Sequence, residues 1–411
     1  MTVAKLVNPL TVRSQADLND PYPLYSALRA NEPVWWCPEA KAWIVSTYAE
    51  AQQILRSVDF EKQIQKWKHA PNPKLAIFLP PLKALSETSS NWLLNLNPPD
   101  HTRVRALVGR TFAPSTITRL KPEIEHTAAE LARIAKEKGE FDLVADFAFP
   151  LPLSIIALIM GIPVSDRERL KNWSNMLVSI AGGNRTIPSL WTSGSAIIEL
   201  RKYLTPLIEE RRKDLKDDLL SMLITAEEED QNQKTRLSTA ELLSNLILFL
   251  VAGQETTVNL ISNGVLCFMR NPAQLAMLKE NPGLMPSAVN EILRFESPAQ
   301  AAPRLANKDV VIAGKTIKKG DMVWLLLGSA NRDSKQFEDP DTFNIARTHN
   351  RHISFSEGIH RCIGASLAEA ECEIALSSLF TNFPDLKLVE QEVNFKFPLA
   401  LRGPQQLIVR A

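Results

Sequence analysis

The chain has 411 residues, of which 45% are hydrophobic and 23% are charged, and 47 basic and 46 acidic residues give it a formal net charge of +1. These are the values of a globular protein, and without a basic excess nucleic-acid binding is not expected. No linker rich in Gly, Ser or Pro divides the sequence. We therefore expect one domain over residues 1–411, although the length alone would allow two or three.

The sequence gives no sign of export or of membrane insertion. Residues 1–10 contain one lysine and a short apolar patch that Asn8 and Pro9 interrupt, so we expect neither a signal peptide nor a membrane anchor. The longest apolar run, residues 246–253, is far shorter than the roughly 18 residues of a membrane span. Four cysteines are too few for a disulfide framework in a chain of this size, which favours a reducing compartment. We expect a cytoplasmic protein.

The first motif along the chain is Pro98-Pro99-Asp100-His101-Thr102-Arg103-Val104-Arg105. On a helix, His101 and Arg105 are four residues apart and share one face, whereas Arg103 and Arg110 point elsewhere. Two such side chains could together bind a carboxylate through charge-assisted hydrogen bonds. The alternative is that both are ordinary solvated surface residues.

A second block of the chain is expected to be a long helix. The charged stretch 227–234 should be a solvated loop, and residues 242–269 after it show a sustained helical pattern. Ser238 and Glu241 have the spacing of a capping box, with Ser238 as the N-cap. Short strands are expected at 310–312 and 323–327, so the fold should be mainly α with small β-sheets.

Polar residues interrupt this apolar helix in its middle. Glu255 and Thr256 would cost free energy on burial unless they are hydrogen-bonded or used. Gly253 removes a side chain where something must approach the backbone, and Thr256 can bond to the carbonyl four residues earlier and open the helix locally. We expect a small polar notch here, in which Gln254 is a neighbour rather than an active group. The alternative is a structurally bonded pair, Thr256 and Thr257, with Glu255 in solvent.

Cys362 follows the run Phe355-Ser356-Glu357-Gly358-Ile359-His360-Arg361 and is itself followed by Ile363-Gly364. Gly358 and Gly364 would let backbone amides approach the sulfur, and a predicted helix over residues 365–380 would place the sulfur near its N-terminus, which favours a thiolate. Without a CxxC pair, zinc and iron–sulfur sites lack their usual ligands. Cys362 is therefore a candidate haem-iron ligand, and the alternative is a small buried hydrophobic residue.

Residues 355–364 resemble the haem-ligand loop of the cytochrome P450 family, F-G-x-G-x-[HR]-x-C-x-G. Three further family signatures recur, at residues 252–257, at Glu291-x-x-Arg294 and at residues 98–105. The resemblance runs from Asn19-Asp20-Pro21-Tyr22 to Ala400-Leu401-Arg402-Gly403, and it is closest to soluble bacterial members. Ser356 departs from the pattern because a glycine is common there, which leaves open how tightly the loop turns and how Phe355 approaches the macrocycle.

The resemblance implies a single-domain fold, a triangular helical prism that encloses haem b, with the Cys362 thiolate as axial ligand of the iron. It implies that Thr256 donates a hydrogen bond at the oxygen site and that Glu255 relays protons to it. It further implies a buried structural set, Glu291 and Arg294 with Arg347 of Phe343-Asn344-Ile345-Ala346-Arg347, where the sequence alone would favour a surface ion pair of little energetic value. Cofactor contacts are implied for eight residues: His101, Arg105, Arg304 and His360 at the propionates, and Phe355, Gly253, Gly358 and Gly364 elsewhere.

The implied activity is that of a haem-thiolate monooxygenase, which inserts one oxygen atom from O2 into a C–H bond or a double bond of a hydrophobic small molecule. Terpenoid, steroid, fatty-acid and polyketide-like substrates are all expected candidates. The expected pocket walls are mostly apolar or small and do not choose among these classes; they comprise residues 67–94, 176–191, 251–252, 299–303 and 398–401.

Electrons are expected from an external ferredoxin or flavodoxin with its NAD(P)H-dependent reductase, because the chain has no flavin, nicotinamide or iron–sulfur motif and no fused reductase. Arg110, Arg351 and Arg361 would lie near the docking surface. Two alternatives remain. A peroxide-driven peroxygenase or isomerase would keep the haem thiolate, although the pair Glu255 and Thr256 argues against it, and a haem or ligand carrier would have no chemistry.

Overall fold

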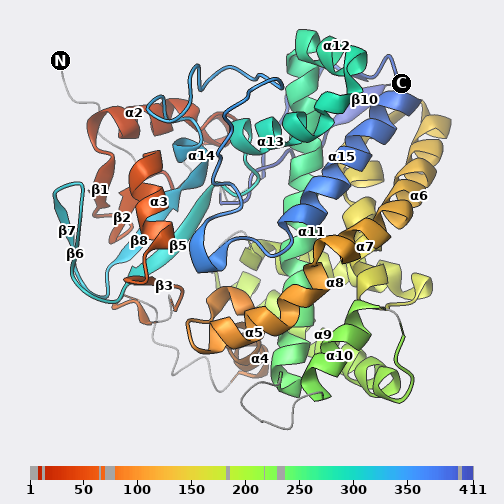
Figure 1. Cartoon of the computed structure of the whole chain (residues 1–411), viewed down its shortest axis with the longest axis horizontal. Helices are drawn as coiled ribbons and strands as arrows, with labels where there is room; N and C mark the ends of the chain where they lie inside the picture. The colour runs from red at the N-terminus through yellow and green to blue at the C-terminus, as the bar shows by residue number, and fades with distance from the viewer. Residues whose placement is uncertain are drawn as a thin grey trace.

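The computed structural model describes residues 8–11, 14–63, 66–69, 79–181, 186–216, 218–228, 237–396 and 400–410. The fold is mainly α with small sheets, as expected (Figure 1). Its α-helices are α1 (Gln15–Asn19), α2 (Tyr22–Asn31), α3 (Tyr48–Arg56), α4 (Pro80–Ser90), α5 (Asp100–Gly109), α6 (Pro114–Lys138), α7 (Pro150–Ile159), α8 (Arg167–Ala181), α9 (Ile187–Lys213), α10 (Leu219–Glu228), α11 (Thr239–Arg270), α12 (Pro272–Glu280), α13 (Met285–Phe295), α14 (Leu327–Ala330) and α15 (Ala365–Asn382).

Short helical turns connect several of these helices: η3 (Leu93–Asn95), η4 (Arg110–Phe112), the π-helical η5 (Val144–Ala148), η6 (Val164–Asp166), η7 (Pro282–Leu284) and η8 (Gly358–His360). The strands are β1 (Val34–Cys37), β2 (Ala42–Val45), β3 (Phe60–Glu61), β4 (Glu140–Asp142), β5 (Ala301–Ala306), β6 (Val310–Ile312), β7 (Lys315–Ile317), β8 (Met322–Leu326), β9 (Lys387–Leu388) and β10 (Ile408–Arg410). No helix among the described residues is long and apolar enough to cross a bilayer.

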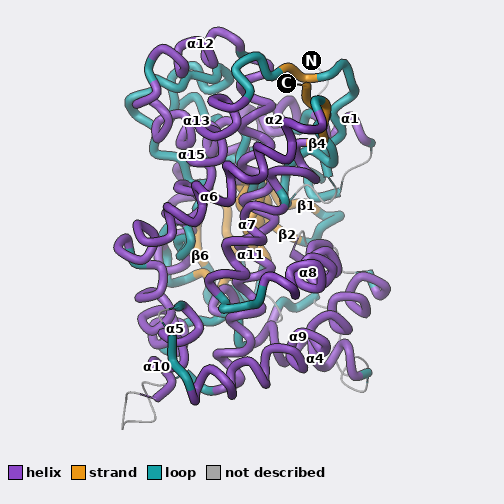
Figure 2. The backbone as a smooth tube through the Cα atoms, turned by 90° about the vertical axis from the view of Figure 1, so that its right-hand side faces the viewer, coloured by secondary structure: helices purple, strands orange, loops and turns teal. Residues whose placement is uncertain are grey.

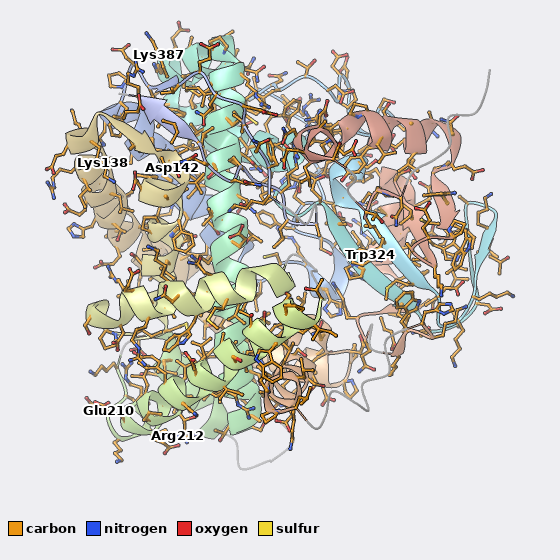
Figure 3. The ribbon with its side chains drawn as sticks, turned by 180° about the vertical axis from the view of Figure 1, so that it is seen from behind. Lys138, Asp142, Glu210, Arg212, Trp324 and Lys387 are labelled. Carbon is orange, nitrogen blue, oxygen red and sulfur yellow. The ribbon has the colours of Figure 1, made fainter. Side chains whose placement is uncertain are left out.

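The strands of the described chain form three sheets. The largest has the order β1-β2-β8-β5-β3, in which β2 and β8 are parallel and the other pairs are antiparallel. A second sheet joins β4, β10 and β9, and β6 pairs with β7. Seen from behind, Trp324 marks the large sheet, while Lys138, Asp142 and Lys387 mark the opposite corner around the second one (Figure 3). The large sheet, α2 and α3 form one side of the molecule, and the long helices form the other (Figure 1).

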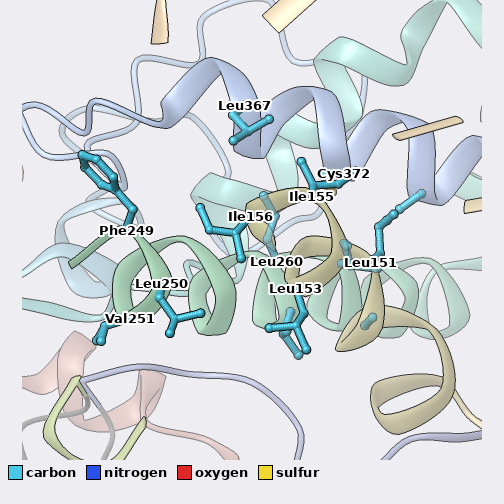
Figure 4. Packing of buried hydrophobic residues seen from close by; sticks show 14 of the residues in the cluster. Leu151, Leu153, Ile155, Ile156, Phe249, Leu250, Val251, Leu260, Leu367 and Cys372 are labelled. Carbon is cyan, nitrogen blue, oxygen red and sulfur yellow. The ribbon is translucent and has the colours of Figure 1, made fainter. Parts of the chain in front are cut away.

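Helix α11 is the centre of the helical side, where α7, α8 and α15 pack against it, and α6 packs against α7 and α15 (Figure 2). Its N-terminus is fixed by the predicted capping box: the Ser238 hydroxyl accepts the Glu241 N–H, and the Glu241 carboxylate accepts the Ser238 N–H. The apolar sequence of α11 is buried almost all round. Ile156 of α7 and Leu367 of α15 pack toward Phe249 and Leu250 of α11 in one hydrophobic cluster (Figure 4). This packing places α15, and the cysteine loop before it, beside the middle of α11.

Most predicted elements are confirmed. Helices α11 and α15 extend the predicted helices by one to three residues, and β6 has the predicted bounds. Two expectations were wrong at their edges. The second predicted strand ends at Leu326, because Leu327 already begins α14, and Glu227 and Glu228 end α10 rather than lying in a loop. The rest of that charged stretch, residues 229–234, lies outside the described residues.

Candidate functional site

The cysteine loop is a tight turn anchored on α3. The Cys362 N–H donates to the Phe355 carbonyl at 2.8 Å, which closes the loop. Gly358 has φ +68°, and a Cβ there would lie 2.5 Å from the Leu55 carbonyl oxygen, so this position requires glycine. Ser356 also takes a left-handed conformation, with φ +60°. Ser356 therefore adopts a backbone conformation that glycine takes without a steric cost.

The Cys362 thiol is accessible although protein surrounds it. The residue is exposed, yet desolvation by the surrounding protein raises the pKa of its thiol. A hydrogen bond from the Gly364 N–H and the charges of Arg361 and Arg105 act in the opposite direction and favour the thiolate. Since α15 begins at Ala365, the sulfur lies just before a helix N-terminus, as predicted. A thiol so placed is suited to be a metal ligand.

Gly364 needs a different explanation from Gly358. Its φ is −90°, and a Cβ there would meet no atom within 4 Å. Neither the backbone conformation nor the packing of the chain requires glycine at this position. Its use is explained if a ligand approaches the loop there.

Helix α11 borders an open space at the predicted notch. Ala252 and Gly253 are exposed in a helix that is otherwise buried around them. The Thr256 hydroxyl donates to the Ala252 carbonyl at 2.7 Å, and the Thr257 hydroxyl donates to the Gly253 carbonyl at 2.8 Å. A Cβ on Gly253 would lie 3.7 Å from Ile156, in ordinary contact. The protein's own packing thus leaves room at this position.

Glu255 does not face solvent. It is 4% exposed, and its Oε1 accepts a hydrogen bond from Lys396 Nζ at 2.9 Å. Lys396 Nζ also lies 3.5 Å from Asn259 Oδ1. The carboxylate therefore belongs to a partly buried ion pair with a residue near the C-terminus, which the sequence did not indicate.

A second carboxyl group lies on the other side of α11. Glu371 of α15 is buried, and burial raises the pKa of its carboxyl to about 8, although a hydrogen bond with Thr257 lowers it somewhat. The Thr257 hydroxyl also donates to the Gly253 carbonyl at 2.8 Å, and its hydrogen bond with Glu371 favours the ionised carboxylate, so it opposes the larger effect of burial. Gln254 is buried beside this chain, and its amide has no hydrogen-bond partner. A carboxyl group that keeps its proton near neutral pH thus lies beside α11.

Cationic side chains gather beside the cysteine loop. His101 of α5 and His360 of the loop have ring centroids 4.4 Å apart, and both nitrogens of His101 are buried without a partner. Burial and the charge of Arg105 lower the pKa of His101 to about 4. Burial, and then the charges of Lys62, His101, Arg304 and Arg105, lower the pKa of His360 far below its usual range. This environment is strongly positive.

Arg304 and Arg105 complete the predicted set. Arg304 is 2% exposed, and its guanidinium donates to the Pro303 carbonyl and, at 3.3 Å, to Ser356 Oγ. Burial lowers the pKa of Arg304 to about 10. Arg105 donates to the Arg361 carbonyl at 2.7 Å and so ties α5 to the cysteine loop. No carboxylate of the described residues forms an ion pair with either arginine.

The site fits the haem that the resemblance implies. Buried cationic groups and unpartnered imidazole nitrogens need an anion, and the two propionates of haem would supply negative charge and hydrogen-bond acceptors. An accessible thiol near a helix N-terminus lies on the same loop as His360, and the helix that follows it, α15, packs against α11. The structure brings His101, Arg105, Arg304, His360 and Cys362 together on one side of the molecule.

The predicted structural residues form a buried network. Glu291 and Arg294 are fully buried and make two hydrogen bonds of 2.8 Å. Arg347 Nε lies 3.2 Å from Glu291 Oε2, and Asn350 donates to the same oxygen. Arg294 also donates to backbone carbonyls of the chain that leads to the cysteine loop, including that of Asn331. The network connects α13 to that segment and is not a surface ion pair.

The surface near the loop and the pocket walls are described in part. Arg110, Arg351 and Arg361 are exposed. The parts of the expected walls at residues 70–78, 182–185 and 398–399 lie outside the described residues. Sequence reasoning missed Lys62, Lys396 and Glu371. None of the three carried a clear local signal, because Glu371 is one of three acids, Glu369, Glu371 and Glu373, in the same predicted helix.

Comparison with known proteins agrees with this site. The family model described as "Cytochrome P450" matches residues 79–409. The chain is 37% identical to a biotin biosynthesis cytochrome P450 of Bacillus subtilis (strain 168), over 100% of this chain and 99% of that protein. It is also 37% identical to a vitamin D(3) 25-hydroxylase of Pseudonocardia autotrophica, over 95% of this chain and 93% of that one.

Solved structures extend the agreement to the fold. The crystal structure of P450BioI in complex with a hexadec-9Z-enoic acid ligated acyl carrier protein has a TM-score of 0.89 at 36% identity, covering 97% of this chain and 100% of that one. CYP109E1 from Bacillus megaterium in complex with testosterone has a TM-score of 0.85 at 32% identity, covering 97% and 99%. The chain therefore belongs to the cytochrome P450 family of haem-thiolate monooxygenases.

Proposed function

We propose that this chain binds haem b through the Cys362 thiolate and hydroxylates or epoxidises a hydrophobic small molecule. The observation that carries the proposal is the placement of an accessible cysteine thiol, with a Gly364 N–H directed at it, beside a cationic cluster that has no carboxylate partner among the described residues. His101, Arg105, Arg304 and His360 would hold the propionates. Phe355, Gly358 and Gly364 would line the cysteine side, and Gly253 the opposite side.

When bound, the haem supplies the redox chemistry by which one oxygen atom of O2 enters the substrate. The chain's own groups would manage protons around it. Thr256 presents its hydroxyl next to the accessible Ala252 and Gly253. Its single O–H donates to the Ala252 carbonyl, so it would donate in the opening after rotating away from that carbonyl. Glu371 holds a proton at its carboxyl near neutral pH and lies in hydrogen-bond contact with Thr257.

Glu255 is the second proposed proton donor, and it must leave its ion pair with Lys396 to act as one. Its Oε1 is held by Lys396, so the carboxylate must exchange this partner before it can reach the opening beside Thr256. Lys396, which is 23% exposed, provides the link to solvent. The acid is thus connected to the surface through a lysine.

The proposed substrates are fatty-acyl, steroid, terpenoid or polyketide-like molecules. Apolar residues of α7 and α11, including Ile156 and Val251, lie near the opening, which supports an apolar substrate. Relatives of similar sequence carry names and bound molecules of several of these classes. A fatty acid linked to an acyl carrier protein therefore belongs beside free fatty acids among the substrates to be tested.

The proposed electron donor is a ferredoxin or flavodoxin with its NAD(P)H-dependent reductase. Arg361 lies directly before Cys362, and with Arg110 and Arg351 it is exposed, which supports docking of an acidic partner on this side. We also propose a cytoplasmic location, because all four cysteines, Cys362 included, are unpaired thiols.

Replacement of the ligand tests the first step. Cys362→Ala should abolish the thiolate-type absorption of the reduced carbon monoxide complex, because no other thiolate can reach the iron. Cys37→Ala, which removes a buried thiol of β1, is the matched control and should keep that spectrum. A normal thiolate spectrum in the Cys362 variant would remove the ligand assignment.

Turnover tests the reaction class. The protein is titrated with free fatty acids, a carrier-linked fatty acid, steroids and terpenes, and a high-spin shift identifies binding compounds. Those compounds should be oxygenated with a surrogate ferredoxin, its reductase and NADPH, with oxygen consumption that depends on substrate. Product formation with peroxide alone would favour the peroxygenase instead, and binding without any product would favour the carrier.

A further inference from the structure

Lys62 is a buried lysine next to the cationic cluster. It directly follows β3, whose Glu61 pairs with Leu305 of β5, so the register brings it opposite Arg304. Its backbone N–H donates to Asn97 Oδ1 at 3.1 Å, while the Asn97 carbonyl accepts the N–H of His101 at 3.0 Å. One asparagine thus fixes both Lys62 and the start of α5. The chain at the end of β3 is thereby held next to the N-terminus of α5.

The ammonium group of Lys62 has no anionic partner. The residue is 8% exposed, and no carboxylate in the described part of the chain forms an ion pair or hydrogen bond with its Nζ. Burial, followed by the positive charge of Arg304, lowers the pKa of Lys62 well below its usual range. A lysine buried among cations costs free energy unless an anion is supplied. The burial of Lys62 would therefore be explained by an anion that is not part of the chain.

The groups that face Lys62 are guanidinium and imidazole side chains, and the low pKa values of the two imidazoles leave them neutral near pH 7. Arg304 faces it from β5 and His360 from the cysteine loop, and His101 and Arg105 follow from α5. The acid on its own strand, Glu61, is engaged elsewhere: its Oε2 accepts from Asn97 Nδ2, and its Oε1 lies 3.7 Å from Lys66 Nζ. Nothing near Lys62 within the described chain can neutralise it except a bound anion.

We propose that Lys62 is a fifth propionate-binding residue and that it takes up a proton when haem binds. The inference rests on the proposed placement of the cofactor. A propionate beside Nζ favours the ammonium form, so the pKa of Lys62 is higher in the loaded protein than in the haem-free chain. Between these two pKa values, binding takes up one proton. Haem affinity then falls as the pH rises through this window, by at most about tenfold per pH unit.

A purely structural lysine would behave differently. Replacing a lysine that the fold needs would destabilise the haem-free chain. Replacing one that is buried without a partner removes the unfavourable burial of a polar group, so Lys62→Met should leave the haem-free chain as stable or more stable while weakening its hold on haem. A residue that binds haem would lower haem affinity when it is replaced but would not lower the stability of the haem-free chain. A structural residue would lower that stability.

The primary experiment measures haem release from the loaded protein to excess apomyoglobin. Lys62→Met should release haem at least about tenfold faster at pH 7, because a charge-assisted hydrogen bond is lost. Lys62→Arg, which keeps the charge, should stay close to wild type. Lys66→Met is the matched control, since the Lys66 side chain is 60% exposed, and it should not change the rate. Wild-type release should accelerate with rising pH above 7, and the Lys62→Met variant should lose this acceleration.

The probe that isolates the charge is haem dimethyl ester, whose propionates are neutral. Exchanging haem for the ester should weaken binding to the wild type more than binding to Lys62→Met. Equal losses, or wild-type release by Lys62→Met, would refute the role of Lys62. An Arg304→Met variant separates the role of Lys62 from the placement of the cofactor. If Arg304→Met also releases haem at the wild-type rate, the cofactor placement itself is wrong. If Arg304→Met releases haem faster and Lys62→Met does not, only the role of Lys62 is wrong.

Discussion

At the residue scale, Glu371 is unusual because it is a carboxyl group buried between two helices without a cation. Burial raises the pKa of this carboxyl to about 8, although its hydrogen bond with Thr257 acts in the opposite direction. The family needs protons beside α11, and Glu371 stores one there near neutral pH. The raised pKa of Glu371 should also make the free energy of unfolding depend on pH.

We expect Glu371 to make the protein less stable as the pH rises from about 4.5 to 8. The folded pKa lies above the unfolded one, so the folded state binds more protons and the free energy of unfolding falls with pH, by up to about 1.4 kcal/mol per unit. Glu371→Gln keeps the shape and cannot ionise. Urea unfolding at pH 5 and pH 8 should show a smaller pH dependence in this variant than in wild type, and equal dependence would contradict the raised pKa.

Single residues were predictable where a local pattern carried the signal. Cys362 stands out by its glycines and by the helix after it, and Glu291 with Arg294 by their spacing. Lys62 and Lys396 carried no such signal, because their meaning depends on partners more than 100 positions away, Arg304 and Glu255. The sequence also made Glu255 a solvent relay, whereas only the folded chain shows its ion pair with Lys396.

At the element scale, the cysteine loop is held by three different elements. Glu357 accepts hydrogen bonds from Gln52 and Arg56 of α3, Ser356 accepts one from Arg304 of β5, and Arg105 of α5 donates to the Arg361 carbonyl. Ser356 stands where the family pattern commonly has a glycine, and Glu357 is the next residue. Their side chains provide contacts that glycine could not. The loop is positioned by side chains as well as by its turn.

Gly358 should be the most sensitive backbone position of this loop. Gly358→Ala forces a left-handed φ on a Cβ and places it against the Leu55 carbonyl, so we expect the free energy of unfolding to fall by about 2 kcal/mol or more. Gly109→Ala is the control: Gly109 has helical φ −61°, and its Cβ would meet nothing within 4 Å. Chemical unfolding of both holoproteins checks this. Equal stabilities would contradict the close contact with α3.

Elements were predicted well where sequence period and caps agree. The capping box at Ser238 and the apolar period after it gave α11 almost to the residue, since both are local. The strand expected at 323–327 lies one residue earlier, at Met322–Leu326, because the turn into α14 follows from packing. The five-stranded order could not be predicted, since β2 pairs with β8 almost 280 positions away.

At the scale of the whole molecule, Arg402 ties the two ends of the chain together. Its guanidinium, 2% exposed, pairs with Glu296 and donates to the carbonyls of Leu18 and Asn19. Its face also stacks on the Phe395 ring at 3.7 Å. The arginine therefore joins α1, the end of α13 and the C-terminal segment at one buried point.

Loss of this tie should destabilise the entire fold. Arg402→Met leaves Glu296 buried without its main partner, and we expect a loss of about 3 kcal/mol in the free energy of unfolding. Arg410→Met removes an arginine that pairs with Glu140 at the surface, where the side chains are 65% and 50% exposed, and it should cost less than about 1 kcal/mol. Urea unfolding of both variants measures the contrast. Similar losses would argue against a central role for Arg402.

The bond between Arg105 and the Arg361 carbonyl joins positions 256 residues apart. The surface that receives the cofactor is therefore a property of the native state alone and has no counterpart in an unfolded or partly folded chain. A ligand that binds only the native state adds to its stability in proportion to the logarithm of the ligand's free concentration. Cellular haem supply thus sets how much of this chain survives proteolysis, as well as how much of it can react.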